Sequence, residues 1–121
     1  MSDVKRQLKL KSAAAKRLLK EFQSYQQEET REKQRLEKLI SEKADETSIK
    51  QQKNVISETS QMIPYCKKKL EQAVEDLNNT KDKCTEAESD LEELNEANDV
   101  LLLIEDANVF VKKNVGSADD V

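Results

Sequence analysis

The chain has no glycine before Gly116 and a single proline, Pro64, so almost nothing in it interrupts a helix. Its apolar residues recur at alternating steps of three and four over nearly the whole length, in registers that begin at Val4, Ile49 and Leu94. Such a spacing keeps one stripe of each helix facing a partner helix. The pattern predicts three mutually packed helices at about residues 3–43, 47–87 and 90–113, forming one domain over residues 1–115 before a flexible tail at 116–121.

The turns must form without glycine or proline. The apolar pattern lapses between Ser41 and Ser48, where Asp45 offers a side-chain oxygen to cap a new helix. Ser89 and Glu92 have the spacing of a capping box and are expected to start the third helix. Short connections make neighbouring helices antiparallel. We therefore predict an all-α, elongated antiparallel three-helix bundle with up-down-up topology and a kink in the second helix at Pro64.

The composition predicts a narrow core. Charged residues make up 38% of the chain and hydrophobic ones 36%, which is too little apolar volume for a thick globular interior. Regular periodicity and strong helix formers argue against a disordered chain of similar composition. Polar residues that interrupt the stripe, such as Gln52 and Glu29, are expected mainly to fix the register. The apolar seam is expected at Leu8, Leu18, Phe22, Leu36, Ile56, Ile63, Leu70, Leu77, Leu94, Leu101 and Ile104.

No pattern for catalysis or metal binding is visible. The chain has no histidine, no phosphate-cradling glycine loop and no nucleophile with a neighbouring base, so we expect no enzyme activity, no cofactor and no metal site. Cys66 and Cys84 lie eighteen positions apart on one predicted helix, roughly 27 Å, too far for a disulfide. Reduced cysteines and a polar N-terminal segment predict a cytoplasmic protein.

Charge is unevenly distributed along the chain. Residues 1–20 carry seven basic side chains against one acid, and residues 86–121 carry eleven acids against two lysines. These segments would neutralise one another within an antiparallel bundle, or the basic segment would face an acidic partner. The net charge of −4 and the scarcity of aromatic residues argue against nucleic acid as the partner, and no membrane association is expected.

Three sequence blocks carry a family resemblance. The run ETSQMIPYCKKKLEQAVEDL, from Glu58 to Leu77, resembles the signature of the tubulin-binding cofactor A family, a Met-Ile-Pro-x-Cys core followed by basic residues. LKLKSAAAKRLLKE, from Leu8 to Glu21, and IKQQKNVISE, from Ile49 to Glu58, are similar to the family's entries to its first and second helices. The resemblance covers roughly residues 4–112.

The resemblance implies a three-helix chaperone that binds and holds newly folded β-tubulin after chaperonin release and before pairing with α-tubulin, without nucleotide. It also implies association with the microtubule cytoskeleton, other tubulin-folding cofactors as further partners, and a monomer or weak homodimer. A structural coiled-coil spacer and a prefoldin-like chaperone subunit remain the alternatives. The expected β-tubulin-binding residues are Lys9, Lys11, Lys16, Arg17, Lys20, Glu58, Gln61, Met62, Pro64, Tyr65, Lys67 and Lys68.

Overall fold

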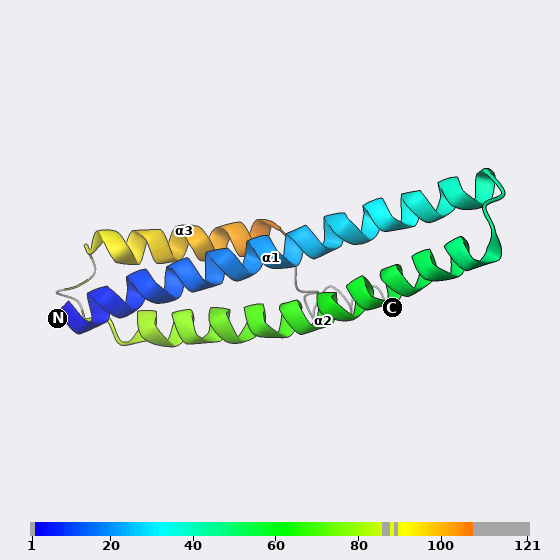
Figure 1. The fold of residues 1–121 in the computed structure, drawn as a ribbon. Helices are drawn as coiled ribbons and strands as arrows, with labels where there is room; N and C mark the ends of the chain where they lie inside the picture. Colours follow the sequence, from blue (N-terminus) through cyan, green and yellow to red (C-terminus); the bar gives the residue numbers. More distant parts are fainter. Residues whose placement is uncertain (1, 86–87, 89, 108–121) are drawn as a thin grey trace, which may run out of the picture. The chain divides into compact units, whose positions relative to one another are not determined.

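The computed structural model describes residues 2–85, 88 and 90–107. This part of the chain contains three α-helices and no strand (Figure 1): α1 (Ser2–Ser41), α2 (Glu46–Asp82) and α3 (Glu92–Asp106). The prediction of an all-α helical bundle is confirmed. Its three helices follow one another in the expected order.

The observed helix ends differ from the expected ones by a few residues. α1 ends at Ser41 rather than at 43, and α2 begins at Glu46 and ends at Asp82 rather than near 87. α3 begins at Glu92 rather than at 90, after Leu91 as N-cap, whose side chain makes no capping bond. Ser89 of the expected capping box, Ala87, residues 108–113 and the tail at 116–121 lie outside the described residues.

The turn between α1 and α2 is built from backbone bonds and one carboxylate. Lys43 takes a left-handed conformation with φ 57°, and the amide of Ala44 donates to the carbonyl of Leu39 at 2.9 Å. This pattern is a Schellman motif in which a lysine occupies the position that usually favours glycine. Asp45 Oδ1 then accepts a hydrogen bond from the amide of Ser48 at 3.1 Å, which caps α2.

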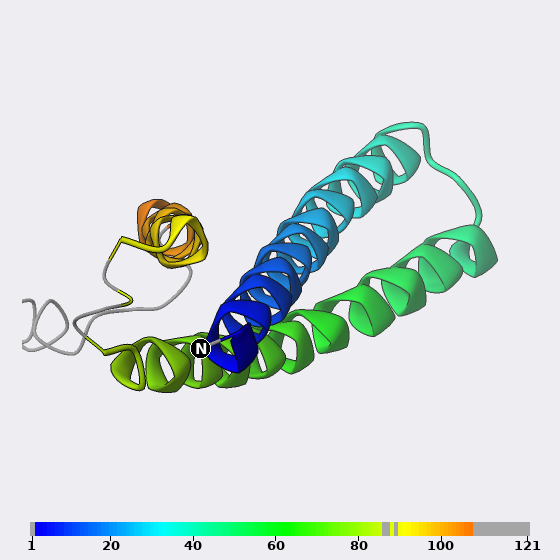
Figure 2. The same cartoon turned by 90° about the vertical axis from the view of Figure 1, so that its left-hand side faces the viewer.

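The chain divides into two compact units, and α1 and α2 contribute to both. Unit 1 comprises residues 1–16 and 73–121, and unit 2 comprises residues 17–72. Within each unit the segments of α1 and α2 run antiparallel (Figure 1). In unit 1, α3 lies alongside them in the direction of α1 (Figures 1 and 2). The expectation of a single domain stays a prediction.

Unit 1 has a fully buried core supplied by all three helices. On the helices its buried side chains are Leu8, Ser12, Ala15, Leu77, Thr80, Ala97, Val100 and Ile104, and Glu88 is buried in the connection before α3. Alanines on α1 and α3 let helix backbones approach closely, since they add little side-chain bulk to the seam. The connection before α3 is held by Glu88, whose Oε1 accepts hydrogen bonds from the amide of Thr85 at 2.8 Å and its hydroxyl at 3.1 Å.

Unit 2 is a two-helix hairpin, and its buried apolar side chains are confined to Leu19, Phe22, Cys66 and Leu70. We call residues 23–65, all of which the structure describes, the hairpin segment. Its one buried side chain is that of Gln52. The expected seam residues Leu36, Ile56 and Ile63 are half-buried here, as are Leu18, Leu94 and Leu101 elsewhere.

Pro64 lies inside α2, and the helix continues through it. Proline has no amide hydrogen, so it cannot donate to the carbonyl of Ser60 four residues earlier. Its ring is exposed, which is where a helix tolerates the missing bond most easily because water can hydrate the carbonyl. The expected kink stays a prediction.

Candidate functional site

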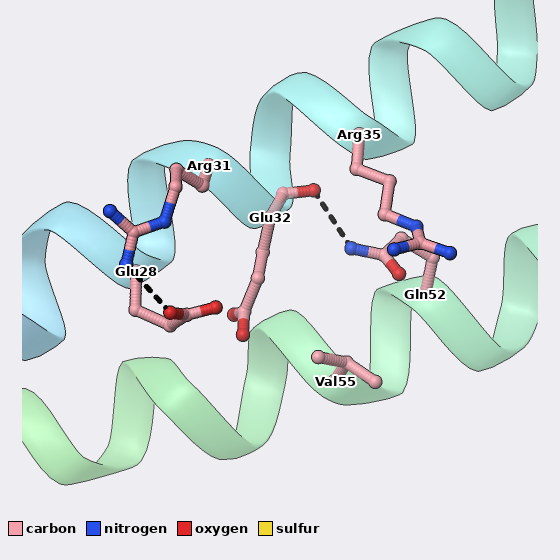
Figure 3. A pocket seen from close by; sticks show the side chains of 6 residues that line it. All are labelled: Glu28, Arg31, Glu32, Arg35, Gln52 and Val55. Atoms are coloured by element: carbon pink, nitrogen blue, oxygen red, sulfur yellow. Dashed lines mark hydrogen bonds and ion pairs between the residues drawn. The ribbon is translucent and has the colours of Figure 1, made fainter.

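The hairpin segment contains a groove between its two helices. It has a volume of about 520 Å³ and is lined by four side chains of α1 and two of α2 (Figure 3): Glu28, Arg31, Glu32, Arg35, Gln52 and Val55. Charged and amide groups therefore form most of its wall, with Val55 as the apolar element. Such a wall can bind peptide or side-chain groups through hydrogen bonds and charge, without a reactive centre.

Two hydrogen bonds fix one part of this wall. Arg31 Nη2 donates to Glu28 Oε1 at 2.8 Å, and this contact lowers the pKa of the Glu28 carboxyl. Gln52 Nε2 reaches across from α2 to the backbone carbonyl of Glu32 at 2.9 Å (Figure 3). Glu32 Oε1 is buried and has no hydrogen-bond partner. These two hydrogen bonds therefore hold the residues at the acidic end of the groove in place.

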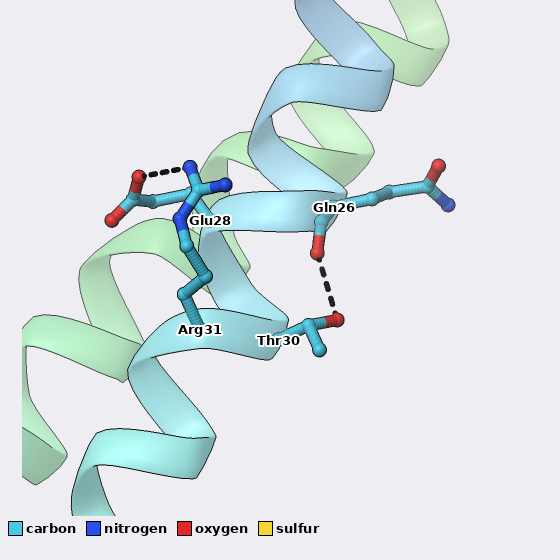
Figure 4. Close-up of polar contacts among 4 residues, drawn as sticks. All are labelled: Gln26, Glu28, Thr30 and Arg31. Atoms are coloured by element: carbon cyan, nitrogen blue, oxygen red, sulfur yellow. Dashed lines mark hydrogen bonds and ion pairs between the residues drawn. The ribbon is translucent and has the colours of Figure 1, made fainter.

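The α1 backbone beside this groove is regular. The Thr30 hydroxyl donates to the carbonyl of Gln26 at 3.1 Å, one turn earlier, on the helix that also carries the Arg31 to Glu28 bond (Figure 4). Thr30 and Gln26, with Gln23 and Gln27, also line a shallower, uncharged hollow of about 340 Å³. Neutral amides therefore border the charged groove residues along α1.

A second groove adjoins the first on α1. It has a volume of about 540 Å³ and is lined by Arg31, Gln34, Arg35, Lys38, Leu39 and Glu42. Arg31 and Arg35 line both grooves, so the two grooves are neighbours on α1. Among the described residues, no ion pair or hydrogen bond engages the side chain of Arg35 or Lys38.

α2 presents exposed apolar side chains within the groove and further along the helix. Val55 is 40% exposed and Tyr65 is 53% exposed, while Met62 is half-buried. Lys69 Nζ lies 4.8 Å from the centroid of the Tyr65 ring, and the contact with Tyr65 raises the pKa of the lysine. The Tyr65 ring thus contacts a cation and stays accessible from solvent.

The expected binding residues on α2 do not share one face. An α-helix turns by about 100° per residue, so Pro64, two residues after Met62, lies on nearly the opposite side of α2. Lys67 lies about 60° around the helix from Pro64, on the same side of α2. Glu58 lies on the other side, with Met62 and Tyr65. Exposed residues are Glu58, Gln61, Pro64, Tyr65 and Lys68, and half-buried ones are Met62 and Lys67.

The expected basic residues on α1 are divided between the two units. Lys9, Lys11 and Lys16 belong to unit 1, and Arg17 and Lys20 belong to unit 2. All are exposed except Lys11, which is half-buried in the seam register. Arg17 Nε lies 3.7 Å from Glu21 Oε2, so part of its charge is compensated on its own helix.

The groove residues Arg31, Arg35 and Val55 were not singled out by the sequence analysis. The sequence does contain a signal for them. Arg31 and Arg35 are four residues apart beside the apolar stripe of α1, and Gln52 is a polar residue at a seam position of α2. That signal is weak in a chain with twenty-one basic residues. Recognising the groove needs the pairing of the two helices.

The described residues contain no cluster of ligands suited to a metal ion. Both cysteines are free thiols, and burial raises the pKa of Cys66 and of Cys84. Thiols of raised pKa are poor nucleophiles. In the described part of the chain, no helix combines the length and apolarity needed to cross a bilayer.

Comparison with known proteins gives consistent matches. The family model for tubulin binding cofactor A matches residues 3–101. Tubulin-specific chaperone A of Oryctolagus cuniculus is 35% identical over 100 residues, covering 83% of this chain and 89% of the relative, and the Homo sapiens protein has the same values. Tubulin-folding cofactor A of Arabidopsis thaliana is 43% identical over 75 residues, 62% of this chain and 66% of that protein.

The fold comparison agrees. The crystal structure of tubulin folding cofactor A from Arabidopsis thaliana matches with a TM-score of 0.81 and 35% identity, over 88% of this chain and 99% of that one. The family model spans most of the chain, and relatives above 30% identity cover most of it as well. The chain therefore belongs to the tubulin binding cofactor A family.

Proposed function

We propose that this protein is a tubulin-folding chaperone that binds β-tubulin after its release from the chaperonin and holds it until it pairs with α-tubulin. The observation that carries the proposal is the match of the family model over residues 3–101. It includes the segment with exposed Tyr65 and half-buried Met62 on a polar two-helix unit. We further propose that the protein acts in the cytoplasm, without nucleotide and without catalysis.

The residues proposed to contact β-tubulin are the basic residues of α1 and the Met62 region of α2, which together do not form one face. They are Lys9, Lys11, Lys16, Arg17, Lys20, Glu58, Gln61, Met62, Pro64, Tyr65, Lys67 and Lys68. Exposed charges steer association more than they strengthen the complex, whereas an aromatic anchor contributes to the lifetime of the complex. A holding chaperone needs both properties, because it must capture its client quickly and still release it.

The first test is capture of purified β-tubulin by the parent protein in the absence of ATP and GTP. Tyr65→Ala removes the exposed ring and should weaken capture by about tenfold, while Lys50→Ala, at an exposed position of the same helix, should leave it unchanged. Circular dichroism checks that both variants stay folded. If the parent captures no β-tubulin, the chain is better described as a structural coiled-coil spacer.

A second pair of variants distinguishes the contribution of Pro64 to β-tubulin capture from that of the basic residues of α1. Pro64→Ala restores a helix bond and should preserve or raise stability while weakening β-tubulin capture. Reversing Lys16, Arg17 and Lys20 to Glu should slow association and reduce its salt dependence. If Pro64→Ala captures β-tubulin as well as the parent, Pro64 is only architectural. If the charge-reversed variant also does so, the basic residues serve the fold.

Other tubulin-folding cofactors are proposed as further partners, and the free protein is proposed to be a monomer or weak homodimer. Analytical ultracentrifugation of the protein alone checks the second point. A tight dimer at micromolar concentration would contradict it.

A further inference from the structure

We propose that the row Arg31, Arg35 and Lys38 on α1 is a docking site for an extended acidic peptide segment of a partner protein. The row lines the two neighbouring grooves of the hairpin segment, Arg31 and Arg35 in both and Lys38 in the second. It shares only the hairpin with the surface proposed for β-tubulin and contains none of that surface's residues. The inference therefore stands whether or not the partner is tubulin.

The row has cations available for a ligand. Among the described residues, the side chains of Arg35 and Lys38 have no ion-pair or hydrogen-bond partner, and both residues are exposed. Arg31 is bonded to Glu28 through one of its nitrogens, so Arg35 and Lys38 are the unpaired cations of the row among the described residues. Guanidinium groups bind carboxylates through two parallel hydrogen bonds, which favours an acidic ligand over other polar ones.

The acids near the row are placed so that they do not cancel it. Figure 3 shows the carboxylates of Glu28 and Glu32 at one end of the groove and the Arg35 guanidinium, beside Gln52, at the other. Glu28 is already bonded to Arg31, and Glu42 is the one acid among the side chains of the second groove. The end of the row formed by Arg35 and Lys38 is therefore its cationic end.

The spacing of the cations suits an extended chain. Along α1, Arg31 and Arg35 are separated by a rise of about 6 Å, and Arg35 and Lys38 by about 4.5 Å. Alternate side chains of an extended peptide are about 6.6 Å apart and point to the same side. Two acidic residues at alternate positions can thus reach Arg35 and either neighbour, while the backbone amides of the peptide face the Gln52 side of the groove.

The test uses a fluorescent peptide of about eight residues with alternating glutamate and glycine, and its glutamine counterpart, in anisotropy titrations at low salt. The parent protein should bind the glutamate peptide saturably, and the glutamine peptide at least about tenfold more weakly. Equal binding of the two peptides, or no saturable binding of the glutamate peptide, would overturn the proposal.

Matched variants locate the site. Arg35→Gln with Lys38→Gln should weaken binding of the glutamate peptide by about tenfold. Lys50→Gln with Lys53→Gln makes the same change in net charge at exposed positions of the same unit and should change binding by less than about twofold. If the control pair weakens binding equally, the attraction is a general effect of net charge and the docking site does not exist.

Charge reversal gives an independent check. The variant Arg35→Glu with Lys38→Glu should lose the glutamate peptide and bind a lysine–glycine peptide instead, because the exchange restores complementarity. Nuclear magnetic resonance should place the largest shifts caused by the glutamate peptide in the parent at residues 31–38 and at the Gln52 side-chain amide. Shifts centred on residues 9–20 would assign the peptide to the other basic region and refute this site.

Discussion

Unit 1 and the hairpin segment of unit 2 use the same two helices and the same heptad spacing, yet they bury very different side chains. In unit 1 the seam positions Leu8, Ala15 and Leu77 are inaccessible to solvent. In the hairpin segment the equivalent register positions, such as Leu36 and Ile56, are only half-buried. The difference follows the number of helices that face each seam, three in unit 1 and two in the hairpin segment.

A seam with one partner helix is hydrated at its edges, so polar residues there cause little loss of stability. In the hairpin segment, hydrogen bonds between polar side chains and the facing helix add to the half-buried apolar contacts. Gln52 donates to the carbonyl of Glu32, and the hydroxyl of Ser60 donates to the carboxylate of Glu29. Unit 1 therefore supplies most of the packing stability, while the hairpin segment keeps polar groups near solvent.

The largest expected effect on stability comes from replacing a leucine by alanine, and its size should differ between the two regions. Leu77→Ala in unit 1 should lower the free energy of unfolding by about 2–5 kcal/mol, because the side chain is fully buried and leaves a cavity. Leu36→Ala in the hairpin segment should cost about 1–2 kcal/mol, since water already reaches part of the side chain. Urea denaturation followed by circular dichroism measures both. Equal losses would show that the hairpin seam is closed in solution.

The next effect tests the polar link between α1 and α2. Gln52→Ala should destabilise the protein by about 1 kcal/mol, because it removes a part-buried hydrogen bond to the Glu32 carbonyl. Gln51→Ala is the matched control at the adjacent, exposed position and should change stability by less than about 0.5 kcal/mol. Indistinguishable variants would show that the hydrogen bond is replaced by water at no cost.

A smaller gain is expected at the turn of the hairpin. Lys43→Gly should stabilise the protein by about 0.5–1 kcal/mol, because Lys43 has a positive φ that glycine adopts without strain. Lys53→Gly, at a helical position of α2, should instead destabilise by about 1 kcal/mol. Melting temperatures of the two variants should therefore move in opposite directions. A shift downward for both would contradict the observed turn geometry.

The smallest effect concerns pH. Hydrogen bonding to Ser48 lowers the pKa of the Asp45 carboxyl, so the ionised form is favoured in the folded state. The resulting stabilisation is fully present above the unfolded pKa of about 3.9 and is lost as the pH falls through the lower folded value. The parent's advantage in melting temperature over Asp45→Ala should shrink over that range.

Asp45→Asn provides the control for this pH dependence. Asparagine can also cap a helix but does not titrate, so its advantage over Asp45→Ala should persist at low pH. A parent whose advantage over Asp45→Ala is independent of pH would show that the carboxylate does not cap α2 in solution.

The amino-acid sequence alone determined the three helices and their order, but not every seam position, since Leu19 and Val100 are buried where Leu18 and Leu101 were expected. Local periodicity carries the information about the helices, because a 3.5-residue apolar spacing repeated over a helix of forty residues is typical of packed α-helices. It also indicated Asp45 as a capping residue of α2, which the hydrogen bond to Ser48 supports. The resemblance of the Met62–Cys66 region to cofactor A led to the family that the comparisons show.

Other features depended on distances that no local pattern encodes. The connection before α3 contains a hydrogen-bonded Thr85 and Glu88 pair that the sequence analysis did not single out. The residues expected to form one binding surface divide between two units and, on α2, between opposite sides of the helix. The groove at Arg35 exists only because α2 places Gln52 and Val55 against α1.

The tertiary structure also decided how deeply each seam residue is buried. Leu77 and Leu36 both occupy apolar positions of the heptad repeat, and nothing in the sequence around them indicates that their burial differs. What separates them is the number of neighbouring helices, which depends on where α3 begins and ends rather than on the repeat itself. A heptad pattern specifies the direction in which a side chain points, but burial requires that other atoms fill the space it points into.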